Sequence, residues 1–214
     1  MALFREHVTV GAVAGAVGVV LLYFYAFVTN PVLLALLFII TTIGSFLPDL
    51  DSDSGVPFHV VFGLISIGAG ALALYATLQH YHSVDEWYII AGIPIAALLF
   101  TWVVVGGVFK HFTHHRGIMH SIPAMAIVGA LAYLAAKHLD QGEMLSVWFA
   151  AAAMLGFATH LVLDEVHSEV NFDGIPFVAK RSLGTALKLF SDSKVVNIIT
   201  YSLLAVLVYT ALYN

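Results

Sequence analysis

The chain has 214 residues, of which 61% are hydrophobic and only 10% are charged. This composition excludes an ordinary soluble globular domain, in which about a quarter of the residues are charged. The formal net charge is −5 and there is no cysteine, so disulfides and thiolate metal sites are excluded. We expect an integral membrane protein with no nucleic-acid partner.

Apolar runs without internal charge follow one another along the whole chain, at 8–28, 31–47, 56–78, 87–109, 118–136, 145–163 and 195–213. Runs of about 17–25 apolar residues can cross a bilayer as α-helices. The first run follows Arg5, but it is about twice as long as the apolar part of a signal peptide, so we expect a retained helix. The sequence predicts an all-α, polytopic membrane protein with about seven transmembrane helices in one domain over 1–214.

Lysine and arginine are distributed unevenly in this seven-helix arrangement. The side that holds the N-terminus receives seven of the eight cations, and the other side receives only Lys137. Because cytoplasmic loops are enriched in Lys and Arg, we expect a cytoplasmic N-terminus. Segment 174–194 mixes apolar residues with Lys180, Arg181 and Lys188. It suits either an amphipathic interfacial helix or a basic loop that only fixes the topology.

Three carboxylates, Asp49, Asp51 and Asp53, alternate directly after the second apolar run. If the chain is extended after Pro48, alternate side chains point the same way, and their repulsion is tolerable when cations bridge them. An EF-hand is excluded, because the glycine comes one residue late and Val60 stands where the bidentate glutamate belongs. The pattern indicates either a metal site or a solvated acidic turn.

Two further segments carry imidazoles on the same expected side. In "THLVLDEVHS", His160, Asp164 and His167 lie on one stripe if the helix continues that far. In "HHRGIMHS", His115 and His120 lie about one turn apart near the start of a helix. Each pattern has a simpler explanation, a structural hydrogen bond for the first and an interfacial histidine-rich loop for the second. The three segments together favour a metal site.

The order of four motifs resembles the YdjM-like family of membrane-bound, metal-dependent hydrolases. The motifs are "EH" before the first run, "LPDLD", "HRGIMHS" and "GFATHLVLDEVHSEV", and the resemblance covers about residues 6–177. That family is grouped by resemblance with zinc phospholipase C and P1 nuclease. The resemblance implies metal ligands at His7, Asp49, Asp51, His115, His120, His160 and Asp164. Ser52 and Met119 depart from the family pattern, and His167 is expected to replace a lost ligand.

We therefore expect a metal-dependent hydrolase at the cytoplasmic face of the inner membrane, acting on a phosphoester or another amphiphilic lipid substrate. Two or three divalent ions, zinc from the nitrogen-rich ligand set, would activate water. Asp53 or Glu165 is the expected general base, and Arg116 the group that stabilises an anion. The alternative is a divalent-metal transporter or a metal-stabilised scaffold. Transport sites lie near the bilayer midplane, whereas these residues lie at helix ends.

Overall fold

The computed structural model of this protein describes residues 3–51, 55–81, 86–112, 119–169 and 187–213. Within these ranges the regular structure is helical, and extended backbone pairs only in an isolated bridge between Ser121 and Lys188. The predicted all-α class is confirmed. The chain expected to form one domain divides into two compact units, Met1–Asp49 with Arg116–Asn214 and Leu50–His115.

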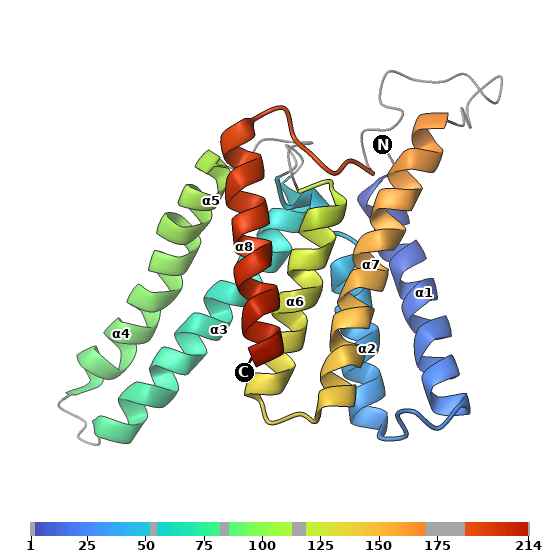
Figure 1. Ribbon diagram of the computed structural model, residues 1–214. Coiled ribbons are helices and arrows are strands. Elements are labelled where there is room, and N and C mark those ends of the chain that lie inside the picture. The colour runs from blue at the N-terminus through green and yellow to red at the C-terminus, as the bar shows by residue number, and fades with distance from the viewer. Residues whose placement is uncertain (1–2, 52–54, 82–85, 113–118, 170–186, 214) are drawn as a thin grey trace. The chain divides into compact units, whose positions relative to one another are not determined.

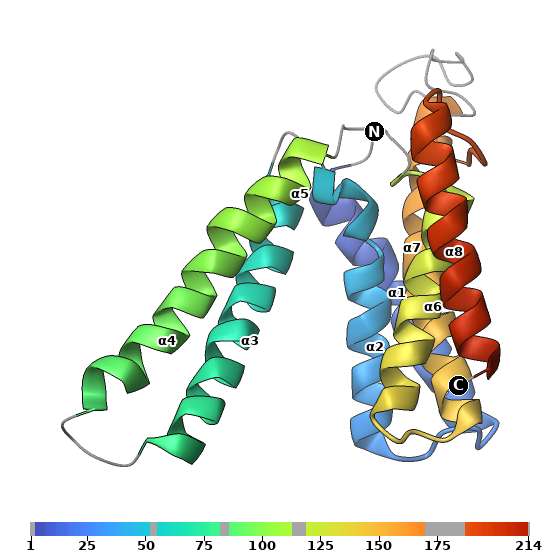
Figure 2. The same cartoon turned by 60° about the vertical axis from the view of Figure 1, so that its left-hand side comes forward.

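The first unit is a helical bundle built from α1 (Phe4–Phe24), α2 (Pro31–Gly44), α6 (Ile122–His138), α7 (Glu143–Glu169) and α8 (Lys194–Tyr213). A short 3₁₀ helix, η1 (Leu47–Asp51), follows α2. Helix α7 packs against α1, α2 and α6, and α8 packs against α6 (Figures 1 and 2). Figure 1 shows that α1 and α6 begin where α7 ends, so segments far apart in the sequence meet at one end of this unit.

The second unit is a helical hairpin. Helix α3 (Val56–His80) packs against α4 (Trp87–Leu99), which continues through the π-helix η3 (Phe100–Val105) into α5 (Gly106–Phe112). Aromatic rings fill the contact near the start of α3, where Phe58 stacks on Phe62 and both lie near Phe109.

Each of the seven apolar runs coincides with a helix or a continuous helical segment. Five are long and apolar enough to cross a membrane, namely Phe4–Phe24, Val56–His80, Trp87–Lys110, Glu143–His167 and Lys194–Tyr213. The other two, α2 and α6, are apolar but have only 14 and 17 residues. Because these two helices are at or below the lower end of the length that crosses a bilayer, the count of about seven stays a prediction.

Side-chain caps set the starts of the two shorter helices. The Asn30 side chain accepts from the backbone N–H groups of Val32 and Leu33 at the start of α2. The Ser121 hydroxyl accepts from the N–H of Ala124 at the start of α6. Such caps satisfy N–H groups that have no partner within a helix. The cap of α6 also fixes the backbone directly after His120.

Glycines bring α1 and α7 unusually close to the end of α2. A Cβ atom on Gly156 of α7 would overlap the carbonyl oxygen of Thr41, and one on Gly11 of α1 would overlap the side chain of Ser45. Only glycine leaves room for a backbone approach of this kind. The end of α2 is therefore held between α1 and α7.

Candidate metal centre

Five acidic and imidazole side chains meet at the end of the first unit where α1 begins and α7 ends. They come from α1, from η1, from the residue before the cap of α6 and from the C-terminal half of α7. They are His7, Asp49, His120, His160 and Asp164. None of the five is more than 8% exposed. Buried carboxylates and imidazoles at this density need bound partners, because desolvating an unpaired charge is costly.

The imidazole Nε2 atoms and the carboxylate oxygens face a common centre. Asp49 Oδ1 lies 3.3 Å from His120 Nε2 and 3.7 Å from His160 Nε2. Asp164 Oδ1 lies 3.4 Å from His7 Nε2, and Asp164 Oδ2 lies 3.8 Å from His160 Nε2. The Nε2 atoms of His120 and His160 are 3.4 Å apart. Three nitrogens and two carboxylates therefore converge.

This spacing fits a divalent ion. Ligand atoms about 2.0–2.1 Å from a tetrahedral zinc lie about 3.3–3.4 Å from one another, close to the shorter separations found here. Two of the buried atoms, His7 Nε2 and Asp49 Oδ1, make no hydrogen bond within the described part of the chain. Such atoms are costly unless something else binds them, and a cation at the common centre would bind both.

A backbone contact orients His160. Its Nδ1 lies 2.8 Å from the carbonyl oxygen of Ser45. The carbonyl can only accept, so Nδ1 carries the proton and Nε2 keeps its lone pair toward the carboxylates. Metal-ligating histidines generally donate their other N–H in this way. The close approach of α7 to α2 at Gly156 is what brings the Ser45 carbonyl within reach.

The charge state of Asp49 suits a metal ligand. Burial by itself raises the pKa of this carboxyl group, but the imidazoles of His120, His160 and His7 outweigh that effect and hold the pKa below its usual value. Asp49 is therefore ionised at neutral pH. An ionised carboxylate is the form that binds a cation.

The five residues form two overlapping groups with metal-binding geometry among the described residues. One is His7, His160 and Asp164, and the other is Asp49, His120 and His160. Because Nδ1 of His160 is bonded to Ser45, only its Nε2 is available to an ion. The two groups therefore share a ligand atom, and the buried cluster can hold a metal ion.

The sequence profile of the YdjM inner membrane protein family matches residues 1–213. The chain belongs to this family. No curated protein and no solved structure matches it. The family description together with the five apolar helices identifies an integral protein of the inner membrane. It names no reaction, so the expected likeness to zinc phospholipase C and P1 nuclease finds no support in the match.

In this YdjM-family protein the cluster contains five of the eight predicted metal ligands. Of the other three, the side chain of Asp51 and all of His115 lie outside the described residues. His167 lies in α7 but in neither group. Its Nδ1 contacts the carbonyl oxygen of Leu163, and its Nε2 lies 3.6 Å from Glu6 Oε2. The structure therefore places His167 beside Glu6 and not in the buried cluster.

The predicted catalytic residues are less well located. Glu165 lies on α7 and is partly exposed, next in the sequence to Asp164 but outside the two groups. Asp53 and Arg116 lie outside the described residues. Their catalytic roles stay predictions.

Sequence reasoning missed the Ser45 carbonyl, which orients His160. A backbone acceptor 115 residues from its partner leaves no pattern in the sequence. The cap at Ser121 could have been predicted from the sequence. A serine directly before an apolar run, with a proline in the first turn, is typical of a helix start.

Proposed function

We propose that this protein is a metal-dependent hydrolase that acts on a phosphoester or another amphiphilic substrate at the cytoplasmic face of the inner membrane. The observation that carries the proposal is the buried convergence of three imidazoles and two carboxylates. Nitrogen-rich ligand sets of this kind suit zinc among divalent ions. When bound, such an ion acidifies water and neutralises charge on substrate oxygens.

The chain's own residues supply the geometry for this chemistry. The Ser45 carbonyl holds His160 in the tautomer that presents Nε2. Asp49 and Asp164 supply two negative charges against a divalent cation, and the buried walls keep bulk water from competing. Glu165, one residue beyond Asp164, is partly exposed and is our candidate for a general base, with Asp53 as the other. Arg116 is the candidate that stabilises an anionic substrate.

The ligand atoms support a proposal for the number of ions. His160 offers only Nε2, and the two groups of ligands share this atom. The second or third ion expected from the sequence would need Asp51 or His115. We propose one ion in the buried cluster, with any further ion bound by those two residues.

The cytoplasmic location rests on the positions of the cations. Within the first unit, Arg5 and Lys194 lie in the first turns of α1 and α8, at the end that holds the cluster. Lys137 lies in the last turn of α6, at the other end. Membrane proteins keep such cations in the cytoplasm. Amphiphilic molecules of the inner leaflet could therefore reach the cluster.

A metal-stabilised scaffold is the second candidate, and one observation favours it. Five protein ligands around one point leave little room for the open position that a catalytic zinc keeps. In that case the ion would tie α1, η1, α6 and α7 together without catalysis. A transporter is less well supported, because its ligands would lie near the midplane, whereas these lie at one end of the helices.

Metal content of the detergent-purified protein, measured by elemental analysis, is the first test. We expect wild type to carry at least one zinc equivalent and the double variant His160→Ala/Asp164→Ala to carry none. The matched control, His138→Ala/Asp140→Ala, changes exposed residues at the opposite end of the unit and should keep the metal. A wild-type protein that purifies without metal and binds none on addition would remove the basis of the proposal.

Hydrolysis separates the two candidate functions. The metal-loaded protein in mixed micelles is assayed on a phospholipid and a chromogenic phosphodiester, before and after a chelator. A hydrolase releases product. Its activity is lost when the chelator removes the metal, and it is also lost in the double variant. If the protein binds zinc, loses thermal stability on chelation and hydrolyses neither substrate, the scaffold is the better explanation.

A further inference from the structure

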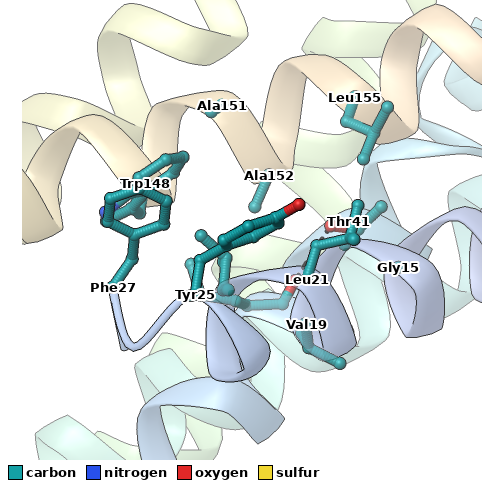
Figure 3. A pocket seen from close by; sticks show the side chains of 13 residues that line it. Gly15, Val19, Leu21, Tyr25, Phe27, Thr41, Trp148, Ala151, Ala152 and Leu155 are labelled. Carbon is teal, nitrogen blue, oxygen red and sulfur yellow. Dashed lines mark hydrogen bonds between the residues drawn. The ribbon is translucent and has the colours of Figure 1, made fainter. Parts of the chain in front are cut away.

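A second feature of the first unit lies away from the cluster. Side chains of α1, α2 and α7 line an apolar groove with a volume of about 330 Å³. Figure 3 shows Val19, Leu21 and Tyr25 on one wall and Trp148, Ala152 and Leu155 on another. Leu21 and Leu155 are 49% and 41% exposed, so the groove opens to the outside of the helices. In a membrane protein that outside is the hydrocarbon of the bilayer.

The dimensions of the groove restrict what can fill it. Its lining on α1 runs from Gly15 to Tyr25, which is about 15 Å at the rise of an α-helix. A helix segment of that length occupies on the order of 1,000 Å³ with its side chains, whereas the groove has a volume of about 330 Å³. A helix with its side chains is about 10–12 Å wide and cannot enter. A single file of methylene groups, each about 4 Å across, can.

The two ends of the groove differ. Toward the metal cluster it ends at Gly15 and Thr41, because beyond them Gly11 and Gly156 bring the helices into direct contact. At the other end Tyr25 and Phe27 follow α1, and Trp148 lies in the second turn of α7. Tyr and Trp gather where membrane helices reach the lipid head groups. Along its length the groove is open to the hydrocarbon of the bilayer; one of its ends lies within the bilayer at Gly15 and Thr41, and the other reaches the interface.

One polar group at the interfacial end lacks a partner. The Trp148 indole Nε1 is buried and makes no hydrogen bond within the described part of the chain. Figure 3 shows it at the edge of the groove beside Phe27. The Thr41 hydroxyl at the inner end donates to the Leu37 carbonyl. This hydroxyl therefore does not need a ligand as its hydrogen-bond acceptor. The lining of the groove itself is apolar, and an apolar chain matches it.

We propose that the groove is a binding site for one acyl chain of a membrane phospholipid. The chain lies along α1 with its methyl end at Gly15 and Thr41, and the ester region lies near Trp148. The head group then sits at the helix ends opposite those that carry His7 and Asp164. A lipid held there is not placed as a substrate of the metal cluster, so this site is independent of the proposed hydrolase activity.

Photo-crosslinking tests the site. The protein is reconstituted in nanodiscs with a small fraction of phosphatidylethanolamine that carries a diazirine in one acyl chain, and labelled peptides are located by mass spectrometry. We expect excess labelling of Leu21, Leu22 and Leu155 over Val206, a 61% exposed residue of α8 outside the groove. Equal labelling of all four would mean that only bulk lipid contacts the helices, and would overturn the proposal.

Two matched substitutions sharpen the result. Ala151→Leu and Ala16→Leu make the same change at exposed positions of membrane-spanning helices, but only Ala151 lines the groove. We expect Ala151→Leu to abolish the excess labelling and Ala16→Leu to leave it unchanged. Gly18→Leu, which fills the groove from α1, should act like Ala151→Leu. If both filling variants are monodisperse and keep the excess labelling, the chain does not bind in the groove.

Discussion

His7, His120 and His160 are each no more than 2% exposed, whereas His167 is partly exposed beside Glu6. The three buried imidazoles differ from that of His167 in their access to water. A solvated histidine satisfies its nitrogens with water, but a buried one needs an ion or a hydrogen-bond partner. At the scale of single residues, the candidate metal ligands are therefore identified by burial and convergence more than by residue type.

One pair of substitutions tests this distinction. We expect His120→Gln to lower zinc affinity by more than the 10–100-fold that is typical of removing an outer partner of a ligand. His167→Gln should leave the affinity unchanged, because His167 contacts Glu6 and Leu163 instead of the cluster. Zinc titration with a competing chelator measures both. Equal losses in the two variants would place His167 in the ligand set, as the sequence predicts.

At the scale of elements, the cluster depends on how closely α7 and α1 approach the end of α2. The carbonyl oxygen of Thr41 and the backbone nitrogen of Ser45 lie where a side chain on Gly156 would begin. The same approach lets the Ser45 carbonyl reach His160. A packing contact between helices thus sets the orientation of a candidate ligand.

Gly156→Ala should therefore weaken metal binding from outside the ligand set. The added methyl group must push α7 away from α2, at a cost of about 1–3 kcal/mol in the free energy of unfolding. Loss of the contact between His160 and Ser45 should lower zinc affinity about 10–100-fold. Thermal unfolding and zinc titration in detergent measure the two effects.

The same change elsewhere serves as the control. No atom lies within 4 Å of the position that a Cβ on Gly68 of α3 would take. Gly68→Ala should be neutral or stabilise by about 0.5–1 kcal/mol, since alanine is the better helix former. If Gly156→Ala binds zinc as tightly as Gly68→Ala does, the orientation of His160 does not depend on the α2–α7 contact.

At the scale of the molecule, the bundle of the first unit has two chemically different ends. One end combines the buried cluster with Arg5, Lys188 and Lys194. The other end carries Lys137 and the aromatic mouth of the groove. Such asymmetry is what orients a membrane protein.

Cysteine labelling tests the orientation, and the absence of native cysteine makes each introduced thiol unique. We expect a membrane-impermeant maleimide added to intact cells to label Gly142→Cys, between α6 and α7. Asp192→Cys, just before α8, should react only after the cells are broken. The unmodified protein gives the background. The reverse pattern would place the cluster on the outer face and contradict a cytoplasmic site.

The helices were predictable because composition alone dictates them. Uncharged apolar runs of the length that spans a bilayer must satisfy their backbone groups internally, and the helix is the local way to do so. The runs at 56–78 and 195–213 became α3 and α8 with nearly the same bounds. The residue types of the candidate site were also readable, because carboxylates and imidazoles at the ends of apolar runs need a partner.

Only the tertiary structure decided which of these residues meet. His7 and Asp164 are 157 positions apart in the sequence, and their side chains come within 3.4 Å only because α1 begins where α7 ends. The spacing along one helix predicted that His167 would join Asp164 in the ligand set. In the structure, His167 of α7 instead lies beside Glu6 of α1. The Ser45 carbonyl and the groove at Trp148 likewise arise from contacts between helices. Local patterns carry no record of such contacts, because close packing is a property of the assembled bundle.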